Sequence, residues 1–330
     1  MSRYLMNSPD DFVLESLEGL TMANRDLVVM RDPLFVRRST LTPGKVGLLS
    51  GGGTGHEPLH AGFVGEGMLD AAVPGAVFAS PTALQVAKAT QSIDSGAGVL
   101  HIVKNYTGDV LNFSIAAELC ADEGVEVETV IVDDDLATDI EGSRVGRRGT
   151  GATLVVEKLC GAACQKGNRL GEVAELGRSV VRQSRSLALA LDACTNPITG
   201  RKSFELPRDE VEFGVGIHGE RGRGRIPFGS ADELVSALAL PLLEALHLQG
   251  GARVIALVNS LGATHTTEQY VVTRALHRLL ASHGVIIERT LTGAYVTALD
   301  MSGVSITLTR VDDELLALWD APVNTTGLRW

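Results

Sequence analysis

The chain has 330 residues, of which 45% are hydrophobic and 21% charged, with a formal net charge of −11. This length is enough for two ordinary domains, and the composition is that of an α/β enzyme rather than a disordered or fibrous protein. The negative charge argues against general nucleic-acid binding, which needs clustered Lys and Arg, and an aromatic content of 4% argues against a base-stacking surface.

The first half alternates strand-like apolar runs with segments of helical length. Strands are predicted at Val46–Leu49, Gly98–Val103 and Val127–Val132, and helices at 81–95, 110–122, 154–165 and 170–183. Strand–helix–strand units imply a mainly parallel sheet with covering helices, whose ligands bind beyond the carboxyl ends of the strands. Three loops are therefore predicted to lie at one edge of the sheet: Ser50–Glu57, Ala79–Thr82 and Lys104–Asp109.

The second half begins with a predicted strand at 186–192. Helices are predicted at 231–248 and 266–283, with a strand at 253–259 between them, and successive antiparallel strands are predicted from Val285 onward. The expected fold is α/β, with two domains that each contain a mixed sheet and covering helices. We place the boundary near Ser184, so that residues 1–184 form the first domain and residues 185–330 the second.

No apolar run reaches the roughly 20 residues that cross a bilayer, and the N-terminal MSRYLMNSPDDF lacks the apolar core of a signal peptide. The four cysteines are too few and too scattered for a disulfide framework: Cys120, Cys160, Cys164 and Cys194. We therefore expect a cytoplasmic protein with reduced thiols.

The stretch SGGGTGHEPLH, residues 50–60, can be interpreted in two ways. His56-Glu57-x-x-His60 spells a zinc-protease pattern, which requires both histidines on one continuous helix. Four of the five residues before His56 are glycine, and Pro58 is best tolerated in the first turn of a helix. The sequence therefore favours a backbone loop that approaches a small polar ligand, with His56 presented to it and no metal bound.

Other motifs give weaker signals. The P-loop ending Gly-Lys-Ser/Thr is missing, and Gly214-x-Gly216-x-x-Gly219 resembles a dinucleotide-binding signature but lacks room for the helix that must follow it. The run Asp133–Asp135 favours a polar loop at a strand end over a metal site. The basic cluster Arg221–Arg225 is interpreted as a solvated loop or a partner contact.

Three residues could carry chemistry, although each has an ordinary structural explanation. A neutral imidazole such as that of His218 is a competent nucleophile near pH 7, but a histidine held in a loop by a hydrogen bond is the commoner case. Asp109 could cap its helix, and Lys104 could be a surface lysine at a strand end.

Four long segments in register together resemble one family over nearly the whole chain: GLLSGGGTGHEPLHAGFVGEGML, KNYTGDVLNF, EFGVGIHGE and DDELLALWDAPVNT. They are similar to the dihydroxyacetone kinases, specifically to the ketone-binding K subunit. The resemblance implies that His218 adds to the ketone carbon to form a covalent hemiaminal. It also implies that Lys104 and residues 53–56 (Gly53, Thr54, Gly55, His56) bind the ketone oxygens, and that Asp109 with His56 accepts the proton of the hydroxyl that attacks phosphorus.

The covalent step is chemically reasonable for so small a ligand, because few contacts are available to bind it. The chain is too short for the nucleotide-binding domain of the single-chain family members. The resemblance therefore implies a phosphotransferase subunit without its own cofactor, which acts with an L subunit carrying ADP or ATP and Mg²⁺. In bacteria that nucleotide receives phosphate from a multiphosphoryl protein of the phosphoenolpyruvate phosphotransferase system. The resemblance also implies a homodimer.

Alternatives remain at this stage. Paralogues of the K subunit bind the ketone and control transcription, and a larger ketose such as erythrulose could replace dihydroxyacetone. The sequence favours the enzyme, because capture alone needs only His218, whereas His56 and Asp109 are also present.

Overall fold

The computed structural model describes residues 4–139 and 145–330. It divides into two compact units, named here the His56 unit and the His218 unit after one residue of each. The His56 unit consists of residues 5–132, 153–179 and 314–330. The His218 unit consists of Tyr4 and the described residues of segments 133–152 and 180–313. The signal-peptide prediction involves residues 1–3, which lie outside the described residues.

Both units are discontinuous in sequence, whereas the sequence predicts a single division near Ser184. The chain end belongs to the His56 unit, where β14 (Asn324–Thr325) pairs with β4 (Gly65–Glu66). Conversely, the described residues of segment 133–152 belong to the His218 unit, where the backbone N–H of Ser186 donates to the carbonyl of Asp134 at 2.9 Å. Local composition cannot predict pairings between segments so far apart in the sequence.

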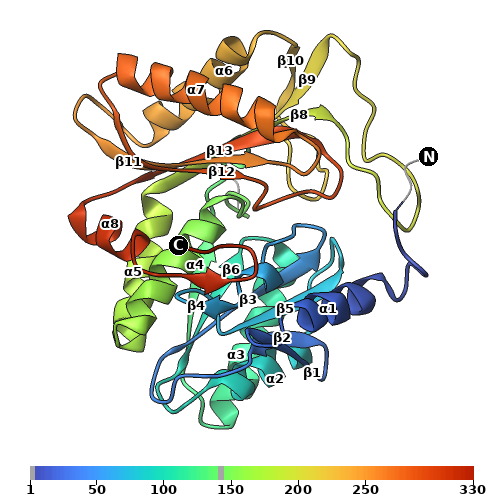
Figure 1. The fold of residues 1–330 in the computed structure, drawn as a ribbon, viewed down its shortest axis with the longest axis vertical. Helices are drawn as coiled ribbons and strands as arrows, with labels where there is room; N and C mark the ends of the chain where they lie inside the picture. The colour runs from blue at the N-terminus through green and yellow to red at the C-terminus, as the bar shows by residue number, and fades with distance from the viewer. Residues whose placement is uncertain (1–3, 140–144) are drawn as a thin grey trace. The chain divides into compact units, whose positions relative to one another are not determined.

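The His56 unit is built on a six-stranded sheet with the strand order β1-β2-β5-β3-β6-β7 (Figure 1). Its four parallel strands are β3 (Gly47–Thr54), β5 (Ala71–Val77), β6 (Val99–Lys104) and β7 (Val127–Val132). The antiparallel strands β1 (Val28–Arg31) and β2 (Phe35–Arg38) extend one edge. The predicted parallel strand–helix–strand organisation is confirmed.

Helices cover this sheet. On one face α2 (Ala83–Ile93) and α3 (Thr107–Asp122) enclose a core that includes Val73, Val103 and Phe113. Val130 of β7 instead packs against Gly177 of α5 (Leu170–Arg182), where a Cβ would lie 2.9 Å from the valine. The remaining helices that carry residues of this unit are α1 (Phe12–Ala23), α4 (Ala152–Gln165) and α8 (Asp313–Trp319).

The His218 unit contains a second six-stranded sheet, with the order β10-β9-β8-β13-β11-β12. Its strands are β8 (Ser184–Asp192), β9 (Glu210–Phe213), β10 (Gly224–Pro227), β11 (Arg253–Ser260), β12 (Ile286–Gly293) and β13 (Ser302–Arg310). Five neighbouring strands of this sheet pair antiparallel: β10, β9, β8, β13 and β11. The sequence predicts antiparallel strands only from Val285 onward, and of the two strands of this sheet in that region β13 alone is antiparallel to its neighbours. Strand β12 differs from the prediction, because it runs parallel to β11.

The parallel pair follows from the element between its strands. Helix α7 (Thr266–Ser282) returns the chain to the start of the sheet, so β12 enters in the same direction as β11. Together with α6 (Ala231–Ala245), α7 covers one face of the sheet, as Figure 1 shows. The apolar core beneath them includes Leu242, Val258 and Leu276.

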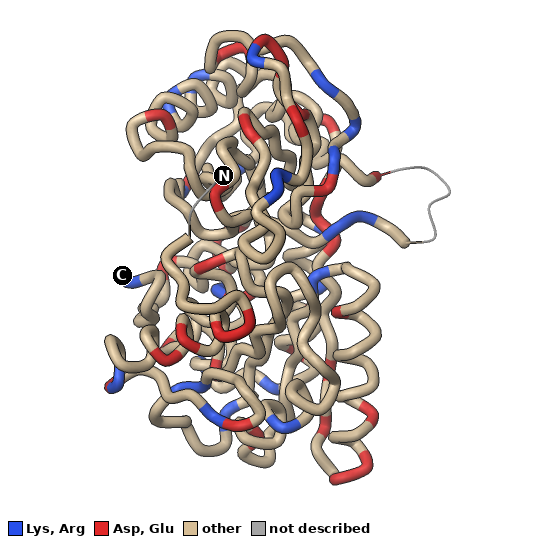
Figure 2. Tube along the Cα trace, turned by 90° about the vertical axis from the view of Figure 1, so that its right-hand side faces the viewer, with Lys and Arg blue, Asp and Glu red and all other residues tan. Residues whose placement is uncertain are grey.

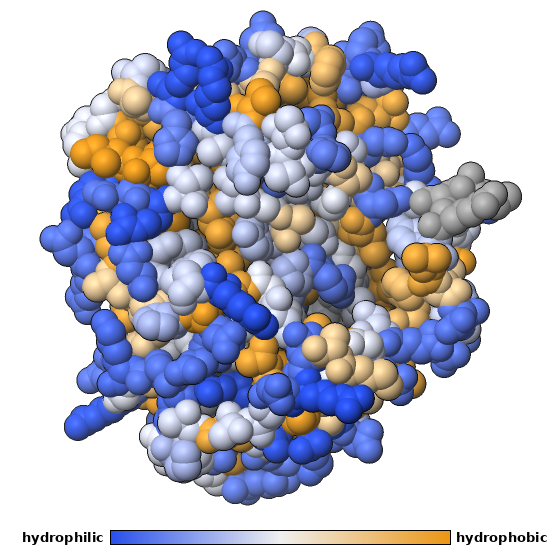
Figure 3. All heavy atoms as spheres, in the orientation of Figure 1, coloured by the Kyte–Doolittle hydropathy of each residue, from blue (hydrophilic) through white to orange (hydrophobic). Residues whose placement is uncertain are grey.

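All four cysteines are buried free thiols. In the described part of the chain, no helix has both the length and the hydropathy needed to span a lipid bilayer. On the face drawn in Figure 3, apolar side chains lie in small groups among polar ones. Lys and Arg alternate with Asp and Glu along the trace in Figure 2, without a continuous basic stripe in that view.

Candidate functional site

The glycine-rich segment is strand as far as Thr54, whereas the sequence predicts a loop from Ser50. Its glycines permit close contact with neighbouring backbone. A Cβ on Gly51 would lie 2.5 Å from the carbonyl oxygen of Val73, and one on Gly53 would lie 2.6 Å from the amide nitrogen of Ala79. The Thr54 hydroxyl donates to the Gly75 carbonyl at 2.7 Å. In this structure, therefore, Gly53 and Thr54 hold the edge of the site in place.

His56 follows the strand in a series of turns. Its side chain is fully buried, and its ring stacks on Phe78 with centroids 5.3 Å apart and planes inclined by 20°. Gly55, at φ 113°, donates its N–H to the Glu57 carboxylate at 3.1 Å. Residues 57–60 are turns and not a helix, so His56 and His60 do not share one helix. The helical geometry that the zinc pattern requires does not form.

Lys104 ends β6 and is fully buried. Its Nζ lies 2.7 Å from Nε2 of His60, and Nδ1 of His60 lies 2.6 Å from Oε1 of Glu157 in α4. The sequence alone does not place His60 at the site, but the structure places it against Lys104. These three side chains form a buried polar chain beneath the glycine strand.

Burial drives all three groups of this chain toward their neutral forms. It lowers the pKa of His60 well below its usual value, with the charges of Lys104 and His56 acting in the same direction. It also lowers the pKa of Lys104, against the opposing effect of the Asp109 and Glu157 carboxylates. It raises the pKa of Glu157 to about 8, against the charge of Lys104.

Asp109 lies in the first turn of α3 and is 3% exposed. Its carboxylate and the Lys104 amino group lie beside the same glycine, Gly52. A Cβ on Gly52 would lie 2.3 Å from Lys104 Nζ and 3.5 Å from Asp109 Oδ2. Within the described residues, Asp109 Oδ1 is buried without a hydrogen-bond partner. Unsatisfied buried oxygens are rare and costly, so this atom indicates a place for a ligand's hydrogen-bond donor.

His218 lies in the turn region between β9 and β10, with a side chain 16% exposed. Its Nδ1 is 3.0 Å from Oε1 of Glu220, and its backbone N–H donates to Oε2 of the same carboxylate at 2.9 Å. Strand β10 follows this turn, and not the helix that a dinucleotide signature requires. Gly216 instead leaves space for the Glu220 side chain, because a Cβ on Gly216 would lie 2.1 Å from Oε2 of Glu220.

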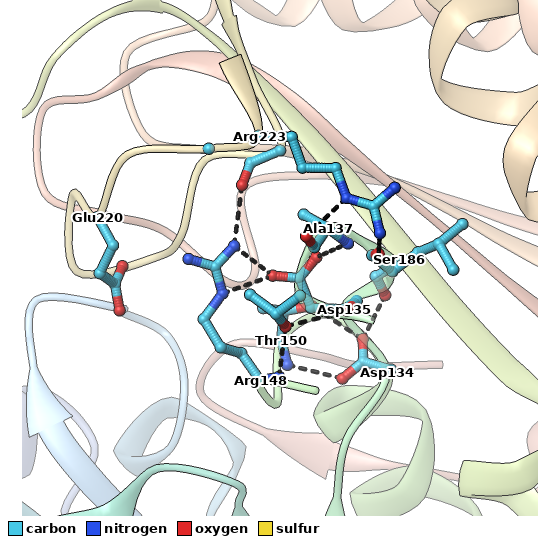
Figure 4. Close-up of polar contacts among 12 residues, drawn as sticks. Asp134, Asp135, Ala137, Arg148, Thr150, Ser186, Glu220 and Arg223 are labelled. Atoms are coloured by element: carbon cyan, nitrogen blue, oxygen red, sulfur yellow. Dashed lines mark hydrogen bonds and ion pairs between the residues drawn. The ribbon is translucent and has the colours of Figure 1, made fainter. Parts of the chain in front are cut away.

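Two of the three successive aspartates, Asp134 and Asp135, form an internal hydrogen-bonded anchor (Figure 4). Asp134 accepts from the backbone and hydroxyl of Thr150 at 2.7 and 2.9 Å, and from the hydroxyl of Ser186. Asp135 accepts from Nε of Arg148 at 2.8 Å. Among the described residues, no group of three His, Cys, Asp or Glu side chains could hold a metal ion. The run is thus a polar loop at a strand end, as interpreted from the sequence.

The arginine cluster is largely engaged within its own unit. Nε of Arg223 donates to the carbonyl of Ala137 at 2.7 Å, and Arg225 pairs with Glu210 at 3.1 Å. Both arginines therefore stabilise the segment that follows His218.

Six of the seven predicted site residues belong to the His56 unit: Gly53, Thr54, Gly55, His56, Lys104 and Asp109. Within it, Lys104 and Asp109 meet at Gly52. His218 belongs to the other unit, with Glu220 as its neighbour.

Four residues of the site were not predicted from the sequence: Phe78, His60, Glu157 and Glu220. One signal was available for Glu157, since its helix is otherwise largely apolar around it, in TLVVEKLCGAAC. A second was available for Glu220, which lies two residues after His218.

Comparison with known proteins gives a consistent result. The Dak1 domain model matches residues 18–327. The dihydroxyacetone-binding subunit DhaK of the PEP-dependent dihydroxyacetone kinase of Escherichia coli is 48% identical, over 99% of both chains. The corresponding subunit of PTS-dependent dihydroxyacetone kinase 1 of Listeria innocua is 44% identical, over 97% of this chain and 98% of that one.

Solved structures agree with these relatives. The dihydroxyacetone kinase of C. freundii superposes with a TM-score of 0.91 at 34% identity, covering all of this chain and 60% of that one. The dihydroxyacetone kinase operon co-activator DhaQ superposes with a TM-score of 0.90 at 32% identity, covering 94% of this chain and 97% of that one. The resemblance to the dihydroxyacetone kinases is confirmed, and the chain belongs to the Dak1 domain family.

Proposed function

We propose that this chain is the dihydroxyacetone-binding subunit of a phosphotransferase that converts dihydroxyacetone to dihydroxyacetone phosphate. One observation carries the proposal: the buried carboxylate of Asp109, with an unpartnered oxygen, lies beside Lys104 at the end of the parallel strands. A ligand hydroxyl would supply the missing hydrogen bond. The relatives named as dihydroxyacetone-binding subunits, which this chain matches over almost its whole length, supply the substrate class.

In the proposed reaction, His218 captures the ketone. A ring nitrogen adds to the carbonyl carbon, and the resulting hemiaminal fixes a ligand that offers few atoms for contacts. Capture by reactivity also rejects glycerol, which has no carbonyl group. Lys104 and the segment Gly53–His56 bind the oxygens of the ketone.

The terminal hydroxyl of the captured molecule is then phosphorylated. Asp109, assisted by His56, accepts the hydroxyl proton as the oxygen attacks phosphorus. We propose that the phosphoryl group comes from an L subunit that carries the nucleotide and Mg²⁺, either through a phosphotransferase chain or from ATP. The chain is proposed to act as a homodimer.

Carbon-13 NMR of dihydroxyacetone labelled at its carbonyl carbon tests the capture step. We expect the ketone resonance to be replaced by a protein-bound tetrahedral one in the wild type and in the control His277→Ala, which removes an exposed histidine of the same unit. The tetrahedral resonance should be absent in His218→Ala. A bound carbon that stays a ketone in the wild type contradicts the proposal, and larger ketoses would then be tested in the same way.

A second function has specific support, because the co-activator DhaQ shares the fold. Phosphorylation in the presence of an L subunit distinguishes the two. An enzyme subunit should turn over, and Asp109→Asn should retain the tetrahedral resonance while losing at least about 100-fold in turnover, the lower range for loss of a general base. Capture without any turnover would favour the regulatory function.

A further inference from the structure

The carboxylate of Glu220 contacts His218 through both of its oxygens. Oε2 accepts the backbone N–H of His218 at 2.9 Å, and Oε1 lies 3.0 Å from Nδ1 of the ring. The first contact fixes the carboxylate relative to the histidine backbone, and the second then fixes the ring. A carboxylate contributes only acceptors to hydrogen bonds, so the ring nitrogen that faces it must carry the hydrogen.

The structure also holds Glu220 itself. The backbone N–H of Gly216 donates to the carbonyl of Glu220 at 3.0 Å, which closes the turn. A Cβ on Gly216 would lie 2.1 Å from Oε2 of Glu220 and 2.5 Å from Nη1 of Arg148, so a larger residue there would displace the ends of both side chains. Glu220 is thus confined between the turn and a guanidinium.

Arg148 is anchored in turn by the aspartate run. Its Nε and Nη2 lie 2.8 and 2.7 Å from Oδ2 of Asp135, and Nη2 donates to the carbonyl of Gly214 at 2.9 Å. Figure 4 shows the Arg148–Asp135 pair, and Glu220 is drawn on the left of the Arg148 guanidinium. The polar anchor therefore reaches, through Arg148, the loop that carries His218.

The surroundings of Glu220 favour its negatively charged form. Burial by itself raises the pKa of this carboxyl, but the hydrogen bond and charge of His218, together with the charge of Arg148, hold it at about 2. Glu220 is therefore ionised throughout the neutral range.

We infer that Glu220 is a positioning residue, which keeps neutral His218 in the tautomer with hydrogen on Nδ1 and so makes Nε2 the nucleophile. This inference rests on the proposed function, because it specifies which ring nitrogen attacks the ketone. The same arrangement orients histidines that bind metals or act as catalytic bases, where a carboxylate fixes the tautomer from the far side of the ring.

In the capture step, a bond forms between Nε2 and the carbonyl carbon while the π electrons of the C=O bond move to its oxygen, which takes a proton from solvent. The ring gains one positive charge, and its Nδ1–H faces the carboxylate of Glu220. An ionised carboxylate therefore favours the adduct as well as the reactive tautomer.

Nitrogen-15 NMR of the histidine rings in the ligand-free protein tests the tautomer. For neutral His218 we expect a protonated Nδ1 and an unprotonated Nε2. Glu220→Gln should weaken that preference, because the amide can donate to Nδ1, and should slow hemiaminal formation by about 10- to 100-fold. The control Glu210→Gln changes a neighbouring glutamate that pairs with Arg225, and it should alter neither measurement.

Hydrogen on Nε2 in the wild type would overturn the inference, as would an unchanged tautomer and rate in Glu220→Gln. If Glu220→Gln does not fold, the wild-type spectrum still decides, and Glu220→Asp offers a second variant that should regain part of the rate. A wild type that shows the expected tautomer but forms no hemiaminal would contradict the proposed function and leave the tautomer assignment intact.

Discussion

Replacing Glu157 by glutamine should stabilise the protein at neutral pH, although it removes a buried acidic residue. Glu157 is fully buried, and burial raises its pKa from 4.5 to about 8. A neutral carboxyl fits the observed contact, because it can donate to Nδ1 of His60. Glutamine can make the same donation through its amide.

The magnitude follows from linkage. Because the pKa of the folded state is the higher one, the stability associated with this group is fully present below pH 4.5 and is lost as the pH rises toward 8. Each pH unit above 4.5 lowers the free energy of unfolding by about 1.4 kcal/mol, so the wild type loses about 3 kcal/mol of stability by pH 7. Glutamine does not titrate, and Glu157→Gln should regain most of that amount at pH 7 and nothing near pH 4.5.

Urea unfolding at several pH values between 4.5 and 8 measures the effect. The control Glu118→Gln, an exposed glutamate on α3, should stay within about 0.5 kcal/mol of the wild type at every pH. A loss of about 3–5 kcal/mol in Glu157→Gln at pH 7 would refute the reasoning, because that is the cost of removing one partner from a buried, ionised pair.

Three further predictions concern the glycines and the polar contacts. Gly53→Ala should cost about 1–3 kcal/mol in urea unfolding because its Cβ meets only backbone atoms, all within 2.8 Å. Gly19→Ala in α1 should instead gain about 0.5–1 kcal/mol, since nothing lies within 4 Å of its Cβ; a loss there would contradict the packing described. The lowered pKa of Glu220 predicts that its contribution to stability is present above pH 4.5 and is lost as the pH falls toward about 2. Glu220→Gln should therefore show a shallower decline in this acid range, and a decline as steep as that of the wild type would be evidence against the pairing with His218.

Local pattern predicts many of the elements, because buried strands and helices differ in the length of their apolar runs and in the residues that flank them. The predicted strand at 127–132 coincides with β7, and the helix predicted at 154–165 differs from α4 by two residues at its start. The errors arise where tertiary contacts decide. Glycine has little intrinsic preference for strands, so the strand character of Gly51–Gly53 comes from β5 alongside.

For the site, too, the sequence predicts what depends on local pattern and topology but not what depends on tertiary contacts. Lys104 and Asp109 could be placed at one edge of the sheet because parallel topology brings strand ends together. The contact between His60 and Glu157 spans 97 residues and depends on how α4 packs against the strands. No local period records such a contact, so it could not be inferred before the fold was known.

The pairing of β14 with β4 has a consequence for synthesis on the ribosome. Glu66 is synthesised well before its strand partner Asn324, so this pair can form only after the whole segment between them has been made. That intervening segment contains the sheet of the His218 unit, whose described residues end at residue 313. A chain truncated after residue 313 and released from the ribosome should therefore protect β11 and β13 from hydrogen exchange more strongly than it protects β4.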